Sequence, residues 1–364
     1  MAYTTIDDPT QHFNTIVWTG AGDTSARSFT GVGFQPDWVW HKCRTDTYNH
    51  HFYDSVRGAG NNSELISNLT AAEGGGAASE HGYLSSFDTD GFSSANGTSS
   101  TGGNLGFNQN SETFVAWNWK AATSFSNDAS ATSVGTIDST GKTNTTAGLS
   151  IISYTGSSAN SNVATVAHGL GVAPKVLIIK DRDASDSDWI VFHSSIGNNK
   201  QLDLNNTGAE VTNTNTWNNT APSSSVFTIG NNSYVNNNGN DYICYCIAPI
   251  KGYSAVGSYT GNGNANGAFV YLGFRPAWIM VKPIDATQNW QIHDTKRLGY
   301  NITNKNLSSN STAVEAENDF MDILSNGFKI RRADVLNVNN EEYIYWAFAE
   351  APFTNSNGVP CNAR

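Results

Sequence analysis

Three polar side chains occupy the same place in three parts of the chain, and two of them are carboxylates, which polysaccharide hydrolysis requires. Asp54, His193 and Asp294 each end a short apolar stretch 18 or 19 residues after a proline. A glycoside hydrolase needs two carboxyl groups roughly 5 to 10 Å apart, and catalysis on a repeat usually breaks the symmetry at one copy. We expect no enzyme here. The alternative role is a polar strand end that contacts Arg57 or Arg297.

A second cluster has the residue types of a transition-metal site. His41, His50 and His51 lie close to Cys43. Adjacent histidines on a strand point to opposite faces, so only one of the pair can join a shared site, and a firm third ligand is missing. The competing interpretation is a polar loop that follows a strand.

An oxygen-rich stretch offers ligands for Ca²⁺, which takes six to eight oxygens on a bent loop. Its candidates are Asp181, Asp183, Asp186 and Asp188. The stretch lacks the glycine and terminal glutamate of an EF-hand, so a solvated hairpin tip is the alternative. No other cofactor is indicated, and the nucleophile motif Gly-x-Ser-x-Gly is absent.

These polar positions belong to a repeated block of Gly-x-x-Pro, an apolar strand, and a lysine six residues after the proline. The three proline and lysine pairs are Pro36 and Lys42, Pro174 and Lys180, and Pro276 and Lys282. The runs after the prolines are apolar on both faces, which favours the central strand of a two-layer sandwich. Each lysine is expected to mark the point where its strand emerges into water.

Further landmarks recur in the same order around each block. An aromatic-Thr-Gly triplet precedes it, and an aromatic-rich strand closes it at 114–119, 242–247 and 343–348. The sequence therefore predicts an all-β protein with three tandem β-sandwich repeats of about 100 residues, jelly-roll or lectin-like. The predicted divisions are repeat 1 at 1–121, a polar linker at 122–148, repeat 2 at 149–252, repeat 3 at 253–354, and a tail at 355–364. Repeat 1 is expected to be detachable, with repeats 2 and 3 packed as a pair.

Charge and hydropathy exclude several classes of partner. The 364 residues carry 20 Lys plus Arg against 31 Asp plus Glu, a formal net charge of -11. Phosphate backbones would repel such a chain, so nucleic acid is not an expected partner. No apolar run reaches the ~20 residues of a membrane span, and the start lacks the features of a signal peptide, so neither membrane insertion nor secretion is expected.

Several segments resemble one family of structural proteins from tailed phages, abundant in marine and cyanobacterial viruses. The resemblance covers nearly the whole chain, and its specific segments are 1–8, 31–40, 53–58, 166–171, 257–263, 274–277 and 347–353. It implies a virion protein assembled in the host cytoplasm, often described as a tail fibre or as lectin-like. Other virion proteins are its implied partners.

Two functions follow from this resemblance. One is a tail-associated fibre or receptor-binding component that adheres to host surface glycans. The alternative is a capsid decoration or cement protein on the virion head, and a polysaccharide depolymerase is a distant third. We expect a homo-oligomer, with a trimer favoured, although three internal units can also imitate a trimer within one chain.

Overall fold

The computed structural model describes residues 3–22, 26–99, 102–157, 163–297, 301 and 303–361. The first two residues of the predicted repeat 1 and the last three of the predicted tail lie outside this range. Antiparallel strands dominate the structure, which confirms the all-β prediction. The helices are single turns: η1 (Pro9–Gln11), α1 (Ala78–His81), α2 (Ala129–Thr132), α3 (Thr214–Trp217) and α4 (Ser233–Asn236).

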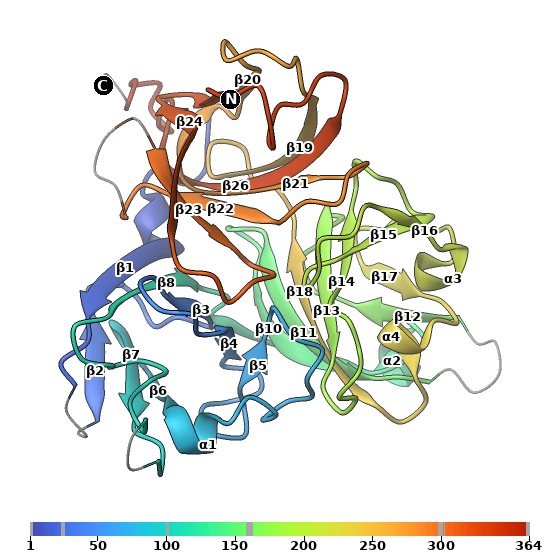
Figure 1. Ribbon diagram of the computed structural model, residues 1–364. Coiled ribbons are helices and arrows are strands. Elements are labelled where there is room, and N and C mark those ends of the chain that lie inside the picture. The colour runs from blue at the N-terminus through green and yellow to red at the C-terminus, as the bar shows by residue number, and fades with distance from the viewer. Residues whose placement is uncertain are drawn as a thin grey trace.

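Three large sheets occupy three sectors of the molecule, coloured blue, green and orange-red (Figure 1). The first has the order β1 (Phe13–Thr19), β8 (Thr113–Trp119), β3 (Trp38–Cys43), β4 (His50–Asp54) and β5 (Leu65–Ile66). The second has the order β16 (Val211–Thr212), β15 (Lys200–Asp203), β14 (Ile190–His193), β13 (Val176–Asp181), β18 (Asp241–Ile247), β11 (Leu149–Thr155), β10 (Ser139–Asn144) and β9 (Thr123–Asn127).

The third sheet also has eight strands and curls over itself. Its order is β19 (Ser254–Thr260), β26 (Glu342–Pro352), β21 (Phe274–Pro283), β22 (Gln291–Asp294), β23 (Thr303–Ser308), β24 (Ala316–Leu324), β25 (Gly327–Ile330) and β20 (Phe269–Tyr271). Two small sheets complete the fold. They are β2 (Arg27–Thr30), β7 (Gly91–Ala95) and β6 (Tyr83–Asp88), and the pair β12 (Ala164–Ala167) and β17 (Val226–Ile229).

One order of five strands runs through all three large sheets. β1-β8-β3-β4-β5 corresponds to β11-β18-β13-β14-β15 and to β19-β26-β21-β22-β23. The strand after each Gly-x-x-Pro block, β3, β13 or β21, is the middle one. Pro36 and Pro174 precede their strands, whereas Pro276 lies inside β21, where the pairing with β26 shifts register. A proline is tolerated at such places because its missing N–H interrupts no ladder there.

Each middle strand is buried on both faces because two different cores meet it. In β3, Trp38 and Trp40 enter a central core, while Val39 faces the layer formed by the small sheet β2-β7-β6. The central core also receives alternate residues of β13 and β21, including Ile178 and Met280. The molecule thus has β-sandwich character, and the inner faces of all three large sheets share one core.

The shared core corrects the expected independence of repeat 1. The ring of Trp38 stacks on Tyr245 of the second sheet at 4.5 Å, and Phe13 stacks on Phe348 of the third at 5.4 Å. Because aromatic side chains supply much of the energy of a core, the first sheet is not a detachable body. It contacts both of the other sheets.

The predicted linker at 122–148 is also corrected, because it forms ordered structure. It supplies β9 and β10, which extend the edge of the second sheet next to β11. Lys142 on β10 forms an ion pair of 2.7 Å with Asp37 of the first sheet's Pro36 block. This segment therefore joins two sheets through backbone pairing and a salt bridge.

No helix within the described ranges is long and apolar enough to cross a membrane.

Candidate functional site

The three lysines after the middle strands are buried, so the expectation that they emerge into water is wrong. Lys42, Lys180 and Lys282 have no exposed surface. The Nζ atom of Lys180 donates to the carbonyl oxygens of Ser187 and Thr70, at 2.7 and 2.9 Å. Desolvation by burial lowers the pKa of each lysine to about 8.

Two of these lysines, Lys180 and Lys282, connect neighbouring sheets through backbone carbonyls. Thr70 follows β5 of the first sheet, and Lys180 belongs to the second. In the same way, Lys282 of the third sheet donates to Thr207, which follows β15 of the second. Lys42 donates to the carbonyls of Cys43 and Asp46 in its own loop, at 2.5 and 3.1 Å. Lys180 and Lys282 therefore cross-link neighbouring sheets, whereas Lys42 fixes the loop that follows its own strand.

The two strand-end carboxylates are also structural. Asp54 accepts from Arg57 Nε at 2.6 Å and from the Tyr245 hydroxyl of the second sheet at 2.7 Å. Asp294 accepts from Arg297 Nε at 2.6 Å and from Trp117 Nε1 of the first sheet at 2.9 Å.

Both contacts between aspartate and arginine expected from the sequence are present, and all four side chains are fully buried. Each carboxylate is thus paired with an arginine of its own sheet.

His193 occupies the equivalent strand end in the second sheet and also contacts a neighbour. Its Nδ1 accepts from the Ser195 amide, and its Nε2 donates to the Tyr345 carbonyl of the third sheet, both at 3.2 Å. Burial lowers the pKa of His193 to about 4. The ring is therefore neutral at pH 7.

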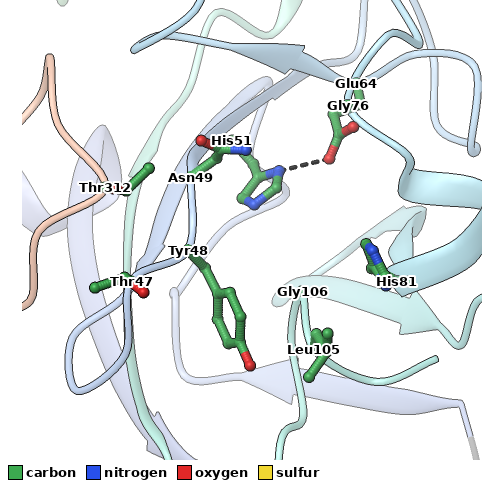
Figure 2. Close-up of a pocket in the computed structure, with 11 residues that line it drawn as sticks. Thr47, Tyr48, Asn49, His51, Glu64, Gly76, His81, Leu105, Gly106 and Thr312 are labelled. Carbon is green, nitrogen blue, oxygen red and sulfur yellow. Dashed lines mark hydrogen bonds and ion pairs between the residues drawn. The ribbon is translucent and has the colours of Figure 1, made fainter. Parts of the chain in front are cut away.

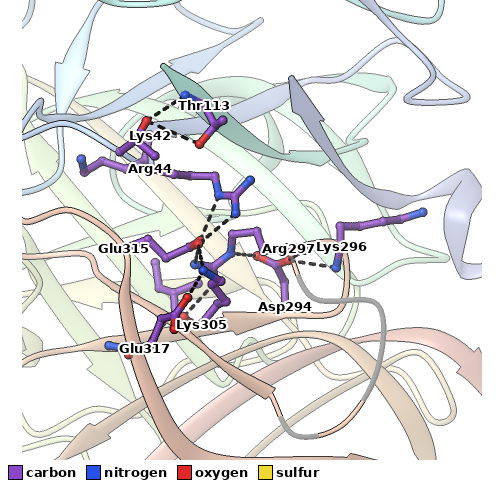
Figure 3. A network of polar contacts seen from close by, with 12 residues as sticks. Lys42, Arg44, Thr113, Asp294, Lys296, Arg297, Lys305, Glu315 and Glu317 are labelled. Carbon is purple, nitrogen blue, oxygen red and sulfur yellow. Dashed lines mark hydrogen bonds and ion pairs between the residues drawn. The ribbon is translucent and has the colours of Figure 1, made fainter. Parts of the chain in front are cut away.

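A glutamate at each interface completes the connection between sheets. The amides of Glu73, Glu210 and Glu315 donate to strand-end carbonyls of the next sheet, at 2.8, 2.7 and 2.7 Å. Between the third and first sheets, Glu315 lies between Arg44 and Arg297 (Figure 3). The first-to-second interface has the same arrangement.

In that first-to-second interface, Glu73 bonds Arg57 and Arg182, at 2.9 and 2.6 Å. At the second-to-third interface Glu210 bonds Lys200 instead.

The candidate Ca²⁺ ligands do not converge. Asp181 accepts from the amides of Asp183 and Ala184, both at 3.0 Å, and Asp188 accepts from the side chain of Asn205 at 2.7 Å. Across the described residues, no group of three or more His, Cys, Asp or Glu could hold a metal ion. Asp183 accepts from the Asp241 amide at 2.7 Å. The carboxylates of Asp181, Asp183 and Asp188 thus bond backbone and amide groups at the end of β13 and in the loop after it, and Asp186 lies in the same loop.

One feature differs from this structural pattern: a pocket of about 260 Å³ beside β4 and β5. We call it the His51 pocket (Figure 2). Its lining residues are Thr47, Tyr48, Asn49, His51, Glu64, Gly76, His81, Gly82, Leu105, Gly106 and Thr312. Thr312 comes from the third-sheet region, and the others come from the first, so the pocket opens close to an interface between sheets.

A buried pair of titratable groups forms one wall of the pocket. His51 Nδ1 lies 2.5 Å from Glu64 Oε1, and the Glu64 side chain is only 1% exposed. A Cβ atom on Gly76 would approach Glu64 Oε2 to 2.2 Å, so any larger residue there would displace the buried Glu64 side chain. A second histidine, His81, uses its Nδ1 to donate to the Gly102 carbonyl at 3.2 Å.

His41 and His50 do not share a metal site with His51. The His41 ring stacks on His51 at 4.7 Å between centroids, and His50 Nδ1 accepts from Trp40 Nε1 at 3.0 Å. Burial and neighbouring cations lower the pKa of His41 and His50 well below the ordinary value. Cys43 is a free buried thiol.

Glu64 was not predicted from the sequence, because it follows His51 by 13 residues in no recognised motif. Strand pairing provides the signal that could have identified it. Glu64 precedes β5 as Gln201 precedes Leu202 in β15 and Asn306 precedes Leu307 in β23. A repeat alignment extended to these short strands would have placed the charged residue diagonally across the strand pair from His51.

The chain was compared with known families, curated proteins and solved structures. Neither a curated protein nor a solved structure matches it. One family profile matches residues 8–352, nearly the whole chain. The protein therefore belongs to the family described as a domain of unknown function, DUF7483.

Proposed function

We propose that the chain consists of three tandem β-sandwich units, closed into a ring around the shared core. The common five-strand order supports this proposal, as do the equivalent contacts at the three interfaces. The direction of contact is the same each time, from the first unit to the second, the second to the third, and the third to the first. Residues 122–148 belong to the second unit in this scheme.

We propose further that the protein is a non-catalytic component of a tailed-phage virion, associated with the tail and adhering to host surface glycans. The observation that carries the proposal is that repeated and unrepeated polar side chains are used differently. The repeated ones, such as Asp54 and Lys180, are used in contacts between sheets. The unrepeated pair His51 and Glu64 lines a pocket instead. That division favours a scaffold with one binding site over a repeated catalyst.

A ring of three units in one chain performs the structural role of a trimer. The main physical reason to expect three chains in a homotrimer therefore no longer applies. The closed set of contacts supports the alternative, in which a single chain imitates a trimer. Light scattering on the purified protein tests this: a monomer mass supports the ring, and a stable trimer mass contradicts it.

Capsid decoration is the second candidate, and the ring itself favours it. Three similar units around one core present similar surfaces in three directions, which suits a threefold position on a capsid lattice. The chemistry of the pocket has no role in this candidate, which depends on area buried between neighbouring proteins.

Immunogold labelling of virions distinguishes the two candidates. Label at the tail supports the receptor-binding function, and label confined to capsid facets replaces it with decoration. Absence from virions overturns both. In parallel, purified protein is incubated with host polysaccharide. Release of reducing ends would contradict the non-catalytic function and favour a depolymerase.

A further inference from the structure

We propose that the His51 pocket binds a single neutral sugar ring, with His51 Nε2 accepting a hydrogen bond from a sugar hydroxyl. This inference rests on the glycan adhesion proposed above and names the class of ligand. It is carried by the hydrogen bonding of the imidazole, the charges around the pocket and the size of the pocket.

The hydrogen bonding of His51 fixes its role. The Glu64 carboxylate can only accept, so Nδ1 of His51 donates to it, and in the neutral tautomer that this bond selects the lone pair is on Nε2. No residue in the described part of the chain donates to or accepts from this Nε2. A carboxylate behind a histidine holds both its tautomer and its orientation. His51 therefore presents a fixed acceptor to the pocket.

The other walls suit a ligand that carries both C–H and O–H groups. Tyr48, Leu105 and His81 surround the same space as His51 (Figure 2). The aromatic ring of Tyr48 offers an apolar face with a polar tip. His81 donates from Nδ1 to a carbonyl, so its Nε2 is a second acceptor in the neutral ring.

The charges around the pocket exclude an anionic ligand. None of the lining residues is a lysine or an arginine, and Glu64 contributes a carboxylate. Burial and the nearby Asp46 raise the pKa of Tyr48 to about 12, which reflects the same negative environment. A uronate, sialate or phosphate would meet repulsion without a compensating cation. A neutral sugar meets none.

The size of the pocket limits the ligand to one ring. Small-molecule pockets usually enclose ~300–1,000 Å³, and the His51 pocket holds about 260 Å³. The remainder of a host glycan would extend from the opening.

The other units provide a matched control for the test. Gln291 and Asn306 occupy the positions of His51 and Glu64 in the third sheet, where the Asn306 side chain donates to Gln291 Oε1 at 2.7 Å. The double substitution His51→Gln/Glu64→Asn therefore replaces the charged pair by a neutral one that the fold already uses. It removes the imidazole acceptor and keeps a cross-strand hydrogen bond.

The experiment measures binding of methyl glycosides of glucose, galactose and mannose, with glucuronate and N-acetylneuraminate as anionic probes. Saturation-transfer NMR and calorimetry are applied to the full chain and to the double variant. We expect at least one neutral glycoside to bind the wild type, and the double variant to bind it more weakly by about tenfold or more, as for loss of a hydrogen bond in a closed site. The unfolding temperature of the variant should match that of the wild type.

The outcomes separate this inference from the proposed function. Tighter binding of an anionic probe, or equal binding by the variant, overturns the inference. If the double variant adheres to host cells as strongly as the wild-type protein does, the inference about the pocket is also overturned. The adhesive function then still stands. Neutral sugar binding without any adhesion to host cells supports the pocket assignment and contradicts the adhesive function.

Discussion

Lys42, Lys180 and Lys282 place amines among backbone carbonyls, and this placement links stability to pH. Each has a pKa near 8 in the folded protein, against about 10.4 in an unfolded chain. Between these values the unfolded state binds more protons, so stability must rise with pH. Above pH 10 the sign reverses, because burial raises the pKa of Tyr154 and Tyr245.

We therefore expect the free energy of unfolding to rise from pH 8 to 10 and then to fall. Lys180→Met should reduce the slope of the rise by up to about 1.4 kcal/mol per pH unit. Urea titrations across this range measure the slope. Lys175→Met, which alters an exposed lysine of the same block, is the control. An unchanged slope in Lys180→Met would contradict the assignment.

His193 stands at the strand end of the second sheet and still contacts a neighbouring sheet. Asp54 and Asp294 each have an arginine three residues later, whereas His193 has Ile196. A neutral histidine can be buried without a neighbouring cation, whereas a buried carboxylate needs a cation to compensate its charge.

His193→Asp should therefore destabilise the protein by about 3–5 kcal/mol, because the carboxylate is buried without a partner. Adding Ile196→Arg should recover at least about 1 kcal/mol through the new ion pair. A double-mutant cycle measured by urea unfolding gives this coupling. Simple additivity of the two substitutions would show that the arginine does not compensate.

At the scale of elements, a feature could be predicted from the sequence only where the residues that stabilise it lie close by in the chain. The middle strands were predictable because Trp38-Val39-Trp40 is apolar on both faces. β10, with the sequence Ser-Thr-Gly-Lys-Thr-Asn, has no apolar alternation, and its strand character comes from pairing with β11 and β9. The burial of Lys180 was hidden for the same reason, because its acceptor Thr70 lies 110 residues away.

Asp37 anchors the β9-β10 edge to the first sheet. Its carboxylate accepts from Lys142 and Ser55, and from the amides of Ala121 and Ala122, at 2.6 to 2.8 Å. Burial acts to raise the pKa of Asp37, but these hydrogen bonds reverse the effect and lower it. The ionised form is thus the one that the fold stabilises.

Asp37→Ala should cost about 2–4 kcal/mol, since it leaves buried donors unpaired. It should also accelerate hydrogen exchange in residues 139–144 relative to the wild type. Asp90→Ala is the control, because that exposed carboxylate also accepts from two amides, those of Gly31 and Gly33. Equal exchange in the two variants would show that Asp37 does not hold this edge.

At the scale of the molecule, a shared core makes the three sheets depend on one another. The central cluster takes side chains from every large sheet, so removing one sheet would expose apolar surface of the other two. Proteins built from independent domains unfold in several steps. We expect this protein to unfold in one.

Glu315 and Glu210 test that dependence at two interfaces of unequal strength. Glu315 is 6% exposed and bonds Arg44 and the fully buried Arg297, whereas Glu210 is 18% exposed and bonds Lys200, which is 33% exposed. Glu315→Ala leaves a buried cation without that partner, so it should cost about 3–5 kcal/mol. Glu210→Ala should cost about 1 kcal/mol, as for a partly solvated pair.

Both variants should still unfold in a single calorimetric transition, because the central core transmits the loss at one interface to all three sheets. A second transition in Glu315→Ala would mean that the first sheet separates once this contact is removed, and that the three sheets are not one cooperative body.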